Sequence, residues 1–249
     1  MYVIRPRGIR GTPAKMAGTL QCQTRFYPNI RHPRRYDYLR DFFMTVPHPE
    51  HVSNAPTTYN DLYHFSSRNK YGQRAILSNF VPVPRFAATQ AEAASLTGTQ
   101  FVVRPLRHSG GLGYRTTGDR LDFIGGQEYI SELFPKRREY RIIFLFGQPV
   151  VVLRKKPNEG VDETQPWGHE NSTFQTINDV PSCKLSGTDV FTRLSAMPAV
   201  QAAHITAADI LYNSKSDPKY AVLELNFCPG IDIENNVRTI AEVIRGRGQ

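Results

Sequence analysis

The segment ITAADILYNSKSDPKYAVLELNFCPG at residues 205–230 contains two apolar stretches that are separated by a polar one. Each apolar stretch has the length and the aliphatic and aromatic content of a buried β-strand. Asp209 interrupts the first stretch, and Glu224 and Asn226 interrupt the second. The period of two along a strand places residues 224 and 226 on one face. If the strand that carries Asp209 is adjacent, three oxygen-bearing side chains lie in one plane.

These three side chains suit a divalent cation. Mg²⁺ in proteins takes oxygen ligands, commonly one or two carboxylates together with the phosphates of a substrate. An acidic residue inside an apolar strand is costly unless it is paired or bound to a metal. The alternative is a purely structural role, in which Asp209 and Asn226 are hydrogen-bonded internally. The pattern favours a magnesium site that also holds the phosphates of a nucleotide.

A glycine-rich loop follows an expected strand at residues 100–105, which carries Arg104 near its end. Glycines let backbone N–H groups approach an anion closely, and a cation beside them can neutralise a phosphate. The alternative is a simple turn, which is the commoner use of glycine-rich loops. The loop residues that could contact a phosphate are His108, Ser109, Gly110, Gly111 and Gly113.

A β-hairpin is expected further along, with strands at 141–146 and 150–154 around a turn at 147–149. We expect Arg141 and Arg154 to face the same side of this hairpin as a clamp for a phosphate or carboxylate. The alternative is that the two arginines form surface ion pairs.

The remaining pattern mixes strands and helices, which indicates an α+β fold. Polar residues dominate 157–180, so this stretch is expected to be a loop. Trp167 within it either contacts a second substrate or belongs to a solvent-facing connection. The other expected strands are 1–4, 128–134, 205–212 and 220–227, and the expected helices are 12–20, 69–77, 87–96, 188–203 and 236–245.

The positive charge is concentrated near the N-terminus. The formal net charge is +9, and residues 1–40 hold nine of the 31 Lys and Arg but only one acidic residue, Asp37. A basic face draws anionic partners, and nucleic acid is one candidate. A basic surface beside an anionic small-molecule site is the alternative that we favour.

Composition excludes several classes of protein. No run approaches the roughly 18 apolar residues of a membrane-spanning helix. The three cysteines have no CxxC spacing, so a disulfide scaffold or a cysteine zinc site is not expected. This usage fits a reducing, cytoplasmic compartment.

The residues named above resemble those of the ATP-grasp superfamily, and specifically of its carboxylate–amine ligases. Glutathione synthetase and the ribosomal-protein glutamate ligases are examples, and short phage-type members are the most similar in character. Asp209 and the run Glu224-Leu225-Asn226 carry this resemblance. The glycine loop and the region of Glu132 support it.

The resemblance implies an α+β ATP-grasp fold, in which two α+β subdomains clasp ATP between antiparallel sheets. An N-subdomain with the glycine loop is expected at residues 68–134, and a C-subdomain with the metal site at 135–249. A short basic N-terminal α/β segment, a reduced form of the domain that precedes ATP-grasp, is expected at 1–67.

The resemblance also implies roles for individual residues. Arg104 stands where the family has a second lysine; the charge is kept, but the planar guanidinium changes the geometry. The residues expected to bind ATP are Lys70, Arg104, His108, Ser109, Gly110, Gly111, Gly113, Glu132, Leu133, Phe134 and Glu139. Arg141, Arg154 and Arg104 are expected to be catalytic, and Asp209, Glu224 and Asn226 to bind metal.

The implied enzyme is an ATP- and Mg²⁺-dependent ligase that forms an amide bond through an acylphosphate and releases ADP and phosphate. Two Mg²⁺ ions are expected, with Mn²⁺ as an alternative. The implied substrates are a small-molecule or peptide carboxylate and an amine, and an anionic macromolecule could bind the basic N-terminal face. An oligomer is compatible with the short N-terminal segment, and the host cytoplasm is the expected compartment of a phage protein. Two other hypotheses are an ATP-grasp kinase and a nucleic-acid-binding protein with a vestigial nucleotide fold.

Overall fold

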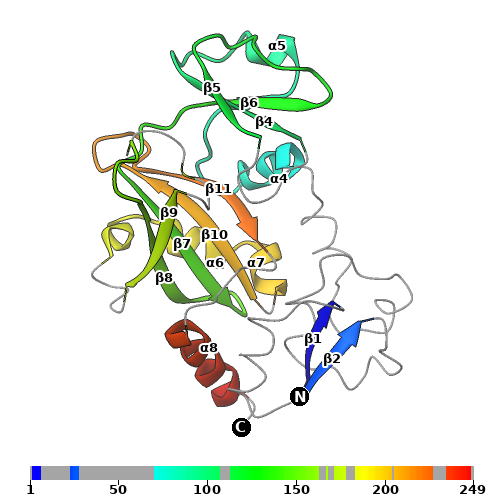
Figure 1. Cartoon of the computed structure of the whole chain (residues 1–249), viewed down its shortest axis with the longest axis vertical. Helices are drawn as coiled ribbons and strands as arrows, with labels where there is room; N and C mark the ends of the chain where they lie inside the picture. Colours follow the sequence, from blue (N-terminus) through cyan, green and yellow to red (C-terminus); the bar gives the residue numbers. More distant parts are fainter. Residues whose placement is uncertain are drawn as a thin grey trace.

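The computed structural model describes residues 2–6, 23–27, 70–106, 113–162, 167, 171–177, 183–203, 205–226 and 234–247. Near the N-terminus, strands β1 (Tyr2–Pro6) and β2 (Gln23–Tyr27) form a parallel pair (Figure 1). A strand at the very start of the chain was expected, and β1 confirms it. The helix expected at 12–20 lies outside the described residues.

A four-stranded antiparallel sheet follows, in the order β3-β6-β4-β5. Its buried side chains form a small core of their own with helix α5. We call it the upper sheet, after its place in Figure 1. Its elements are β3 (Phe86–Ala87), α5 (Gln90–Ala93), β4 (Phe101–Pro105), β5 (Arg115–Thr117) and β6 (Glu128–Glu132).

A five-stranded antiparallel sheet, the lower sheet, has the order β11-β10-β7-β8-β9. The helical elements of this part of the chain are η4 (Lys184–Gly187), α6 (Val190–Ser195), α7 (Pro198–Ala202) and α8 (Glu234–Arg247). Its strands are β7 (Arg138–Leu145), β8 (Gln148–Pro157), β9 (Ser172–Ile177), β10 (Ile205–Tyr212) and β11 (Tyr220–Asn226).

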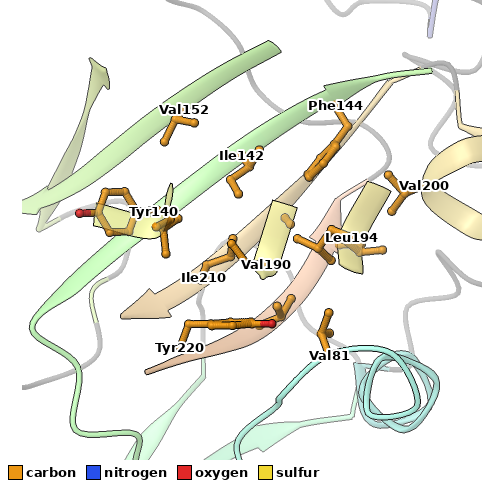
Figure 2. Packing of buried hydrophobic residues seen from close by; sticks show 14 of the residues in the cluster. Val81, Tyr140, Ile142, Phe144, Val152, Val190, Leu194, Val200, Ile210 and Tyr220 are labelled. Carbon is orange, nitrogen blue, oxygen red and sulfur yellow. The ribbon is translucent and has the colours of Figure 1, made fainter. Parts of the chain in front are cut away.

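Both faces of the lower sheet are buried, because successive side chains of each strand alternate between two cores. On β7, Ile142 and Phe144 pack with α6 and α7, as Figure 2 shows. Ile143 and Leu145 point to the other face and pack with α8. Burial on both sides explains why these strands read as continuous apolar runs rather than as alternating ones.

Helix α4 (Lys70–Leu77) connects the two sheets. The backbone N–H of Lys70 donates to the carbonyl of Leu106, which directly follows β4, at 2.9 Å. The side-chain amide of Gln73 donates to the carbonyl of Leu225 on β11 at 2.9 Å and accepts from its N–H at 3.2 Å. β11 is an edge strand, and Gln73 satisfies backbone groups there that would otherwise have no partner strand.

Three expectations about secondary structure are wrong in part. The stretch 157–180 contains a strand, β9, whose sequence STFQTI is too polar to stand out. The helix expected at 87–96 is the short α5, which begins after Thr89 because Thr89 and Glu92 form a capping box. The helix expected at 188–203 is divided into α6 and α7, with Pro198 at the first turn of α7.

The β7–β8 hairpin turns one residue earlier than expected. Phe146 and Gly147 both have positive φ, 51° and 78°, as a tight two-residue hairpin turn requires. Beyond the turn, Phe144 pairs with Pro149 and Ile143 pairs with Val151, which leaves Val150 as an extra residue. This bulge shifts the register of the rest of β8 by one residue.

The described residues therefore form two antiparallel sheets with a few helices, and the α+β prediction is confirmed. None of the helices described in the structure is long and apolar enough to cross a membrane. Where the chain divides into subdomains stays a prediction.

Candidate active site

A row of polar side chains crosses the lower sheet from β11 to β7. Asp209 on β10 lies opposite Glu224 on one side and opposite Arg141 on the other. The Arg141 guanidinium donates from Nε to Asp209 Oδ1 at 2.6 Å and from Nη2 to Oδ2 at 2.8 Å. The ring of Phe174 on β9 lies beneath this guanidinium, 4.6 Å from its central carbon. Arg141 is thus fixed by a two-point ion pair and by an aromatic face.

Asn226 joins the two carboxylates. Its Nδ2 donates to Asp209 Oδ2 at 3.1 Å and to Glu224 Oε1 at 3.2 Å. A bulge in β11 makes this possible: Asp209 pairs with Glu224 but Ile210 pairs with Val222, so one residue is left over. The extra residue turns Glu224 and Asn226 away from the core that contains Val222 and onto the side of Asp209.

Lys70 reaches the row from helix α4. Its Nζ lies 2.7 Å from Glu224 Oε2, and the Glu224 side chain is 23% exposed. Burial raises the pKa of Glu224, but the charges of Lys70 and Arg104 and the hydrogen bond from Asn226 outweigh burial and lower the pKa to about 2. The carboxylate is therefore ionised throughout the physiological range.

Arg104 enters from the upper sheet, where it pairs with Tyr129 of β6. Its Nε is buried and has no hydrogen-bond partner in the part of the chain that the structure describes. Arg104 also acts on the pKa of Glu224 and of Lys136, so it lies near both. A buried guanidinium N–H without an acceptor is costly, and an anion in the site would satisfy it.

Glu139 lies in a second cluster on the same side of the lower sheet as Arg141. Its carboxylate accepts from Lys136 Nζ at 2.5 Å and lies 3.2 Å from Lys155 Nζ. Lys136 Nζ also lies 3.4 Å from the centroid of the Trp167 ring, and Lys155 donates to the Trp167 carbonyl. Burial lowers the pKa of Lys136 to about 8, although Glu139 opposes this.

Arg154 does not share a face with Arg141. It lies opposite Tyr140 on β7, on the side of the core that contains Tyr140 and Val152. The expected clamp of Arg141 and Arg154 on one side is therefore wrong. The bulge at Val150 shifts β8 by one residue, which moves Arg154 to the opposite face of the sheet from Arg141. Lys155 takes the position opposite Glu139 instead. A catalytic role for Arg154 stays a prediction that this geometry does not support.

The expected adenine-binding segment lies at the end of β6. The carboxylate of Glu132 binds the loop between α5 and β4, where Oε1 accepts from the backbone N–H groups of Thr97 and Gly98 at 2.8 and 3.0 Å. Leu133 and Phe134 follow, with the Leu133 N–H bound to the carbonyl of Gln100 at 2.9 Å. Glu132 therefore has a structural task, and its role toward a nucleotide stays a prediction.

The glycine loop lies mostly outside the described residues, which include only Gly113. Gly113 has a φ of 74° and lies close to the ring of Pro105, which a Cβ would approach to 3.2 Å. Its glycine is thus required by the backbone and by space. His108, Ser109, Gly110 and Gly111 keep their expected roles as predictions.

Three residues of the site were not expected from the sequence: Arg74, Lys136 and Lys155. Arg74 could have been found from its spacing, because residues four apart on the predicted helix share a face and Lys70 is already on that face. No sequence signal distinguishes Lys136 and Lys155 from ordinary surface lysines. Among the described residues the site brings together six cations and three carboxylates, which are Lys70, Arg74, Arg104, Lys136, Arg141 and Lys155 with Glu139, Asp209 and Glu224.

This arrangement suits a bound polyanion with a divalent cation. The excess of cations attracts phosphate groups, and the oxygen donors Asp209, Glu224 and Asn226 are typical of Mg²⁺. No cluster of three or more His, Cys, Asp or Glu occurs in the part of the chain that the structure describes. The candidate metal site is accordingly a set of two carboxylates and an amide rather than a closed protein cage.

No protein-family model matches the chain and no curated protein sequence matches it. Solved structures do match. The ATP-grasp ligase PsnB, complexed with its minimal precursor, Mg and ADP, is 14% identical with a TM-score of 0.62, and the alignment covers 100% of this chain and 97% of PsnB. In another PsnB complex the alignment covers 74% of this chain and only 61% of that one, at 17% identity and a TM-score of 0.52.

Two further neighbours extend this result. D-cycloserine synthetase DcsG is 11% identical with a TM-score of 0.57, and 100% of each chain is covered. The macrocyclase MdnC of Microcystis aeruginosa MRC, bound with the precursor peptide MdnA, is 12% identical with a TM-score of 0.58, covering 99% of this chain and 100% of MdnC. At such identities the likeness establishes a shared fold. The chain has the ATP-grasp fold, as the resemblance in its sequence implied.

Proposed function

We propose that this protein is an ATP- and Mg²⁺-dependent carboxylate–amine ligase. The observation that carries the proposal is the row of Glu224, Asp209 and Arg141 across the lower sheet, closed by Asn226 and by Lys70. Carboxylates and cations meet there within hydrogen-bond distance. Four enzymes of the same fold, including a D-alanine–D-alanine ligase complexed with ATP, support the reaction class.

The metal ligands are Asp209, Glu224 and Asn226. Two Mg²⁺ ions, or Mn²⁺ in their place, would draw on these oxygens and on phosphate oxygens, and would stabilise the negative charge of phosphoryl transfer. The carboxylates fit this task because Glu224 is ionised, with a pKa of about 2, and Asp209 is held in place by Arg141. Lys70 and Arg141 balance the two charges when no metal is bound.

The nucleotide lies between the two sheets in this proposal. Lys70 and Arg104 bind the phosphates, and the glycine loop, with His108, Ser109, Gly110, Gly111 and Gly113, covers them. Leu133 and Phe134, beside Glu132, bind the adenine, and Glu139 binds the ribose. The unpartnered Nε of Arg104 supports this assignment, since a phosphate oxygen is the acceptor that it lacks.

The reaction has two steps. A substrate carboxylate oxygen attacks the γ-phosphorus, the bond to the β-phosphate oxygen breaks, and ADP and an acylphosphate form. An amine nitrogen then attacks the acyl carbon, phosphate leaves with the bonding electrons, and the amine loses a proton. Arg141 orients the carboxylate and neutralises charge, while Lys136 and Lys155 add positive potential beside Glu139.

The neighbours name two kinds of substrate. PsnB is complexed with a minimal precursor and MdnC with a precursor peptide, whereas DcsG is a synthetase of a small molecule. We propose the same two classes for this chain, with a subdomain boundary between residues 134 and 135. The basic segment at 1–40 would favour an acidic peptide.

The first test is calorimetric binding of a non-hydrolysable ATP analogue, with and without Mg²⁺. The wild type is compared with Glu224→Gln and with a matched control, Glu242→Gln, which removes an exposed carboxylate of α8. We expect magnesium-dependent binding that weakens at least about tenfold in Glu224→Gln, since one charged ligand of the metal is lost. The control should bind like the wild type.

The second test identifies the reaction. The protein is incubated with ATP, Mg²⁺, hydroxylamine and either a peptide or a small carboxylic acid. Hydroxylamine converts an acylphosphate into a hydroxamate. ADP release together with hydroxamate supports a ligase, and a phosphorylated hydroxyl product indicates a kinase instead. A folded wild type that binds no nucleotide but binds nucleic acid would overturn the proposal in favour of the vestigial fold.

A further inference from the structure

Arg74 is a buried cation that forms no ion pair with any residue the structure describes. Its side chain is among the most buried in the described chain, with the residue only 2% exposed. Among the described residues, none accepts a hydrogen bond from its Nε or Nη1. Burying an unpaired guanidinium is costly in proteins, so its retention calls for a compensating interaction.

Two aromatic rings of the upper sheet hold the Arg74 guanidinium. Its central carbon lies 5.2 Å from the ring centroid of Tyr129 and 6.0 Å from that of Phe86. Aromatic faces stabilise a cation weakly and do not use up its N–H donors. The rings therefore fix the position of the charge and leave the Nε and Nη1 donors open.

Arg74 lies beside the cations assigned to phosphate. It is one helical turn beyond Lys70 and shares that face of α4, and Gln73 beside it is bound to β11. Tyr129, which holds Arg74, is the direct strand partner of Arg104. The charges of Arg104 and Glu224 both act on the pKa of Arg74, which burial lowers. Two guanidinium groups with buried, unpartnered Nε atoms thus lie near one another and repel.

We propose that Arg74 is a positioning residue for the polyphosphate chain of the nucleotide, and this inference rests on the proposed nucleotide site. Its charge, held in a low-dielectric environment by Phe86 and Tyr129, raises the positive potential at Lys70 and Arg104. It also repels the Arg104 guanidinium, which keeps that group directed toward the phosphates. The repulsion between the two arginines is relieved when the anion binds.

The inference predicts opposite effects on stability and on binding. Arg74→Met keeps a long side chain between the two rings and removes the buried charge. The unliganded variant should melt at the same temperature as the wild type or higher, because replacing a buried charge with an apolar group is neutral or stabilising. Its affinity for a polyphosphate should fall about tenfold, as expected for the loss of one nearby unit charge.

The test uses inorganic tripolyphosphate in EDTA, with binding measured by calorimetry on the full chain. This probe contains no adenosine and needs no metal, so it separates the phosphate site from the nucleotide and the magnesium sites. Arg74→Lys, which keeps the charge, should bind within about threefold of the wild type. Arg120→Met removes an exposed arginine from the turn between β5 and β6 that donates to the Leu96 carbonyl, and it should bind like the wild type.

Wild-type affinity for tripolyphosphate in Arg74→Met would overturn the inference. So would equal weakening in Arg74→Met and Arg74→Lys, because packing rather than charge would then explain the loss. If Arg74→Met does not fold, Arg74→Gln replaces it, and failure of both to fold assigns Arg74 a structural role instead. If tripolyphosphate binding depends on Arg74 but the protein does not bind the ATP analogue, the role of Arg74 toward phosphate is supported and the proposed function is overturned.

Discussion

Arg141 and Asp209 lie directly opposite each other on β7 and β10 and are joined by two hydrogen bonds, of 2.6 and 2.8 Å. The two side chains are only 12% and 19% exposed. Asp209 outweighs the effect of burial and raises the pKa of Arg141. The pair therefore fixes a carboxylate that we assign to the metal before any metal binds, and this preorganisation has measurable consequences.

Breaking this pair from one side should destabilise the protein more than removing both partners. We expect Arg141→Met to lower the free energy of unfolding by about 2–4 kcal/mol, since it leaves the Asp209 carboxylate partly buried and unpaired. The double variant Arg141→Met/Asp209→Asn should recover a large part of this loss. Urea denaturation of the two single variants and the double variant at pH 7 measures the coupling. Strictly additive losses would show that the pair does not act as a unit.

The depressed pKa of Glu224 predicts how stability depends on pH. The folded pKa is about 2 and the ordinary value is 4.5. The unfolded state binds the proton more readily, so the stabilisation by ionised Glu224 is complete above about pH 4.5 and is lost as the pH falls toward 2. Its size is on the order of 3 kcal/mol, since one pKa unit corresponds to about 1.4 kcal/mol.

Glu224→Gln should remove this part of the acid dependence. Urea denaturation at pH 5 and pH 3 should show a smaller loss of stability between the two pH values in Glu224→Gln than in the wild type. Glu242→Gln should behave like the wild type, because Glu242 is exposed. Parallel curves for all three proteins would contradict the assigned pKa.

Much of the lower sheet could be predicted because its strands are long apolar runs bounded by polar turns. Residues 205–212 and 220–227 were expected as strands, and β10 and β11 occupy them almost entirely. The period of two also places Glu224 and Asn226 side by side, and a hydrogen bond of 3.2 Å joins them. β9 could not be predicted because it is a polar edge strand without a strong hydrophobic pattern.

The register could not be predicted from the sequence. A two-residue turn with an unbroken ladder would pair Glu139 with Arg154 and give the expected pair of arginines on one side. The bulge at Val150 pairs Glu139 with Lys155 instead. A shift of one residue exchanges the faces of a strand, and bulges depend on the packing of the whole sheet rather than on local sequence.

The β7–β8 turn requires glycine at residue 147. Its φ of 78° disfavours any residue with a Cβ, and that atom would lie 3.4 Å from the Cα and Cγ of Gln201. We expect Gly147→Ala to lower the free energy of unfolding by about 1 kcal/mol or slightly more. Thermal or urea denaturation measures it. Gly187→Ala is the control, because a Cβ there meets nothing within 4 Å, and its effect should stay within about 0.5 kcal/mol.

The hydrogen bonds of Gln73 to β11 link the edge of the lower sheet to the candidate site. Gln73→Leu keeps the bulk of the side chain but leaves the N–H and the carbonyl of Leu225 without their partners on α4. Each unsatisfied buried group costs about 1–3 kcal/mol, so we expect the two groups together to cost roughly 2–6 kcal/mol in urea denaturation. Because Lys70 is one turn away on the same helix, binding of the ATP analogue should weaken as well.

Gln90→Leu provides the matched control for this prediction. Gln90 also donates its amide to a backbone carbonyl, that of Leu121, but it is exposed and lies in the upper sheet's helix α5. We expect a change in stability within about 0.5 kcal/mol and unchanged nucleotide binding. If Gln73→Leu lost stability while it bound the ATP analogue like the wild type, the docking of α4 on β11 would serve the fold alone. A joint loss of stability and affinity would show that one side-chain amide holds Lys70 against Glu224.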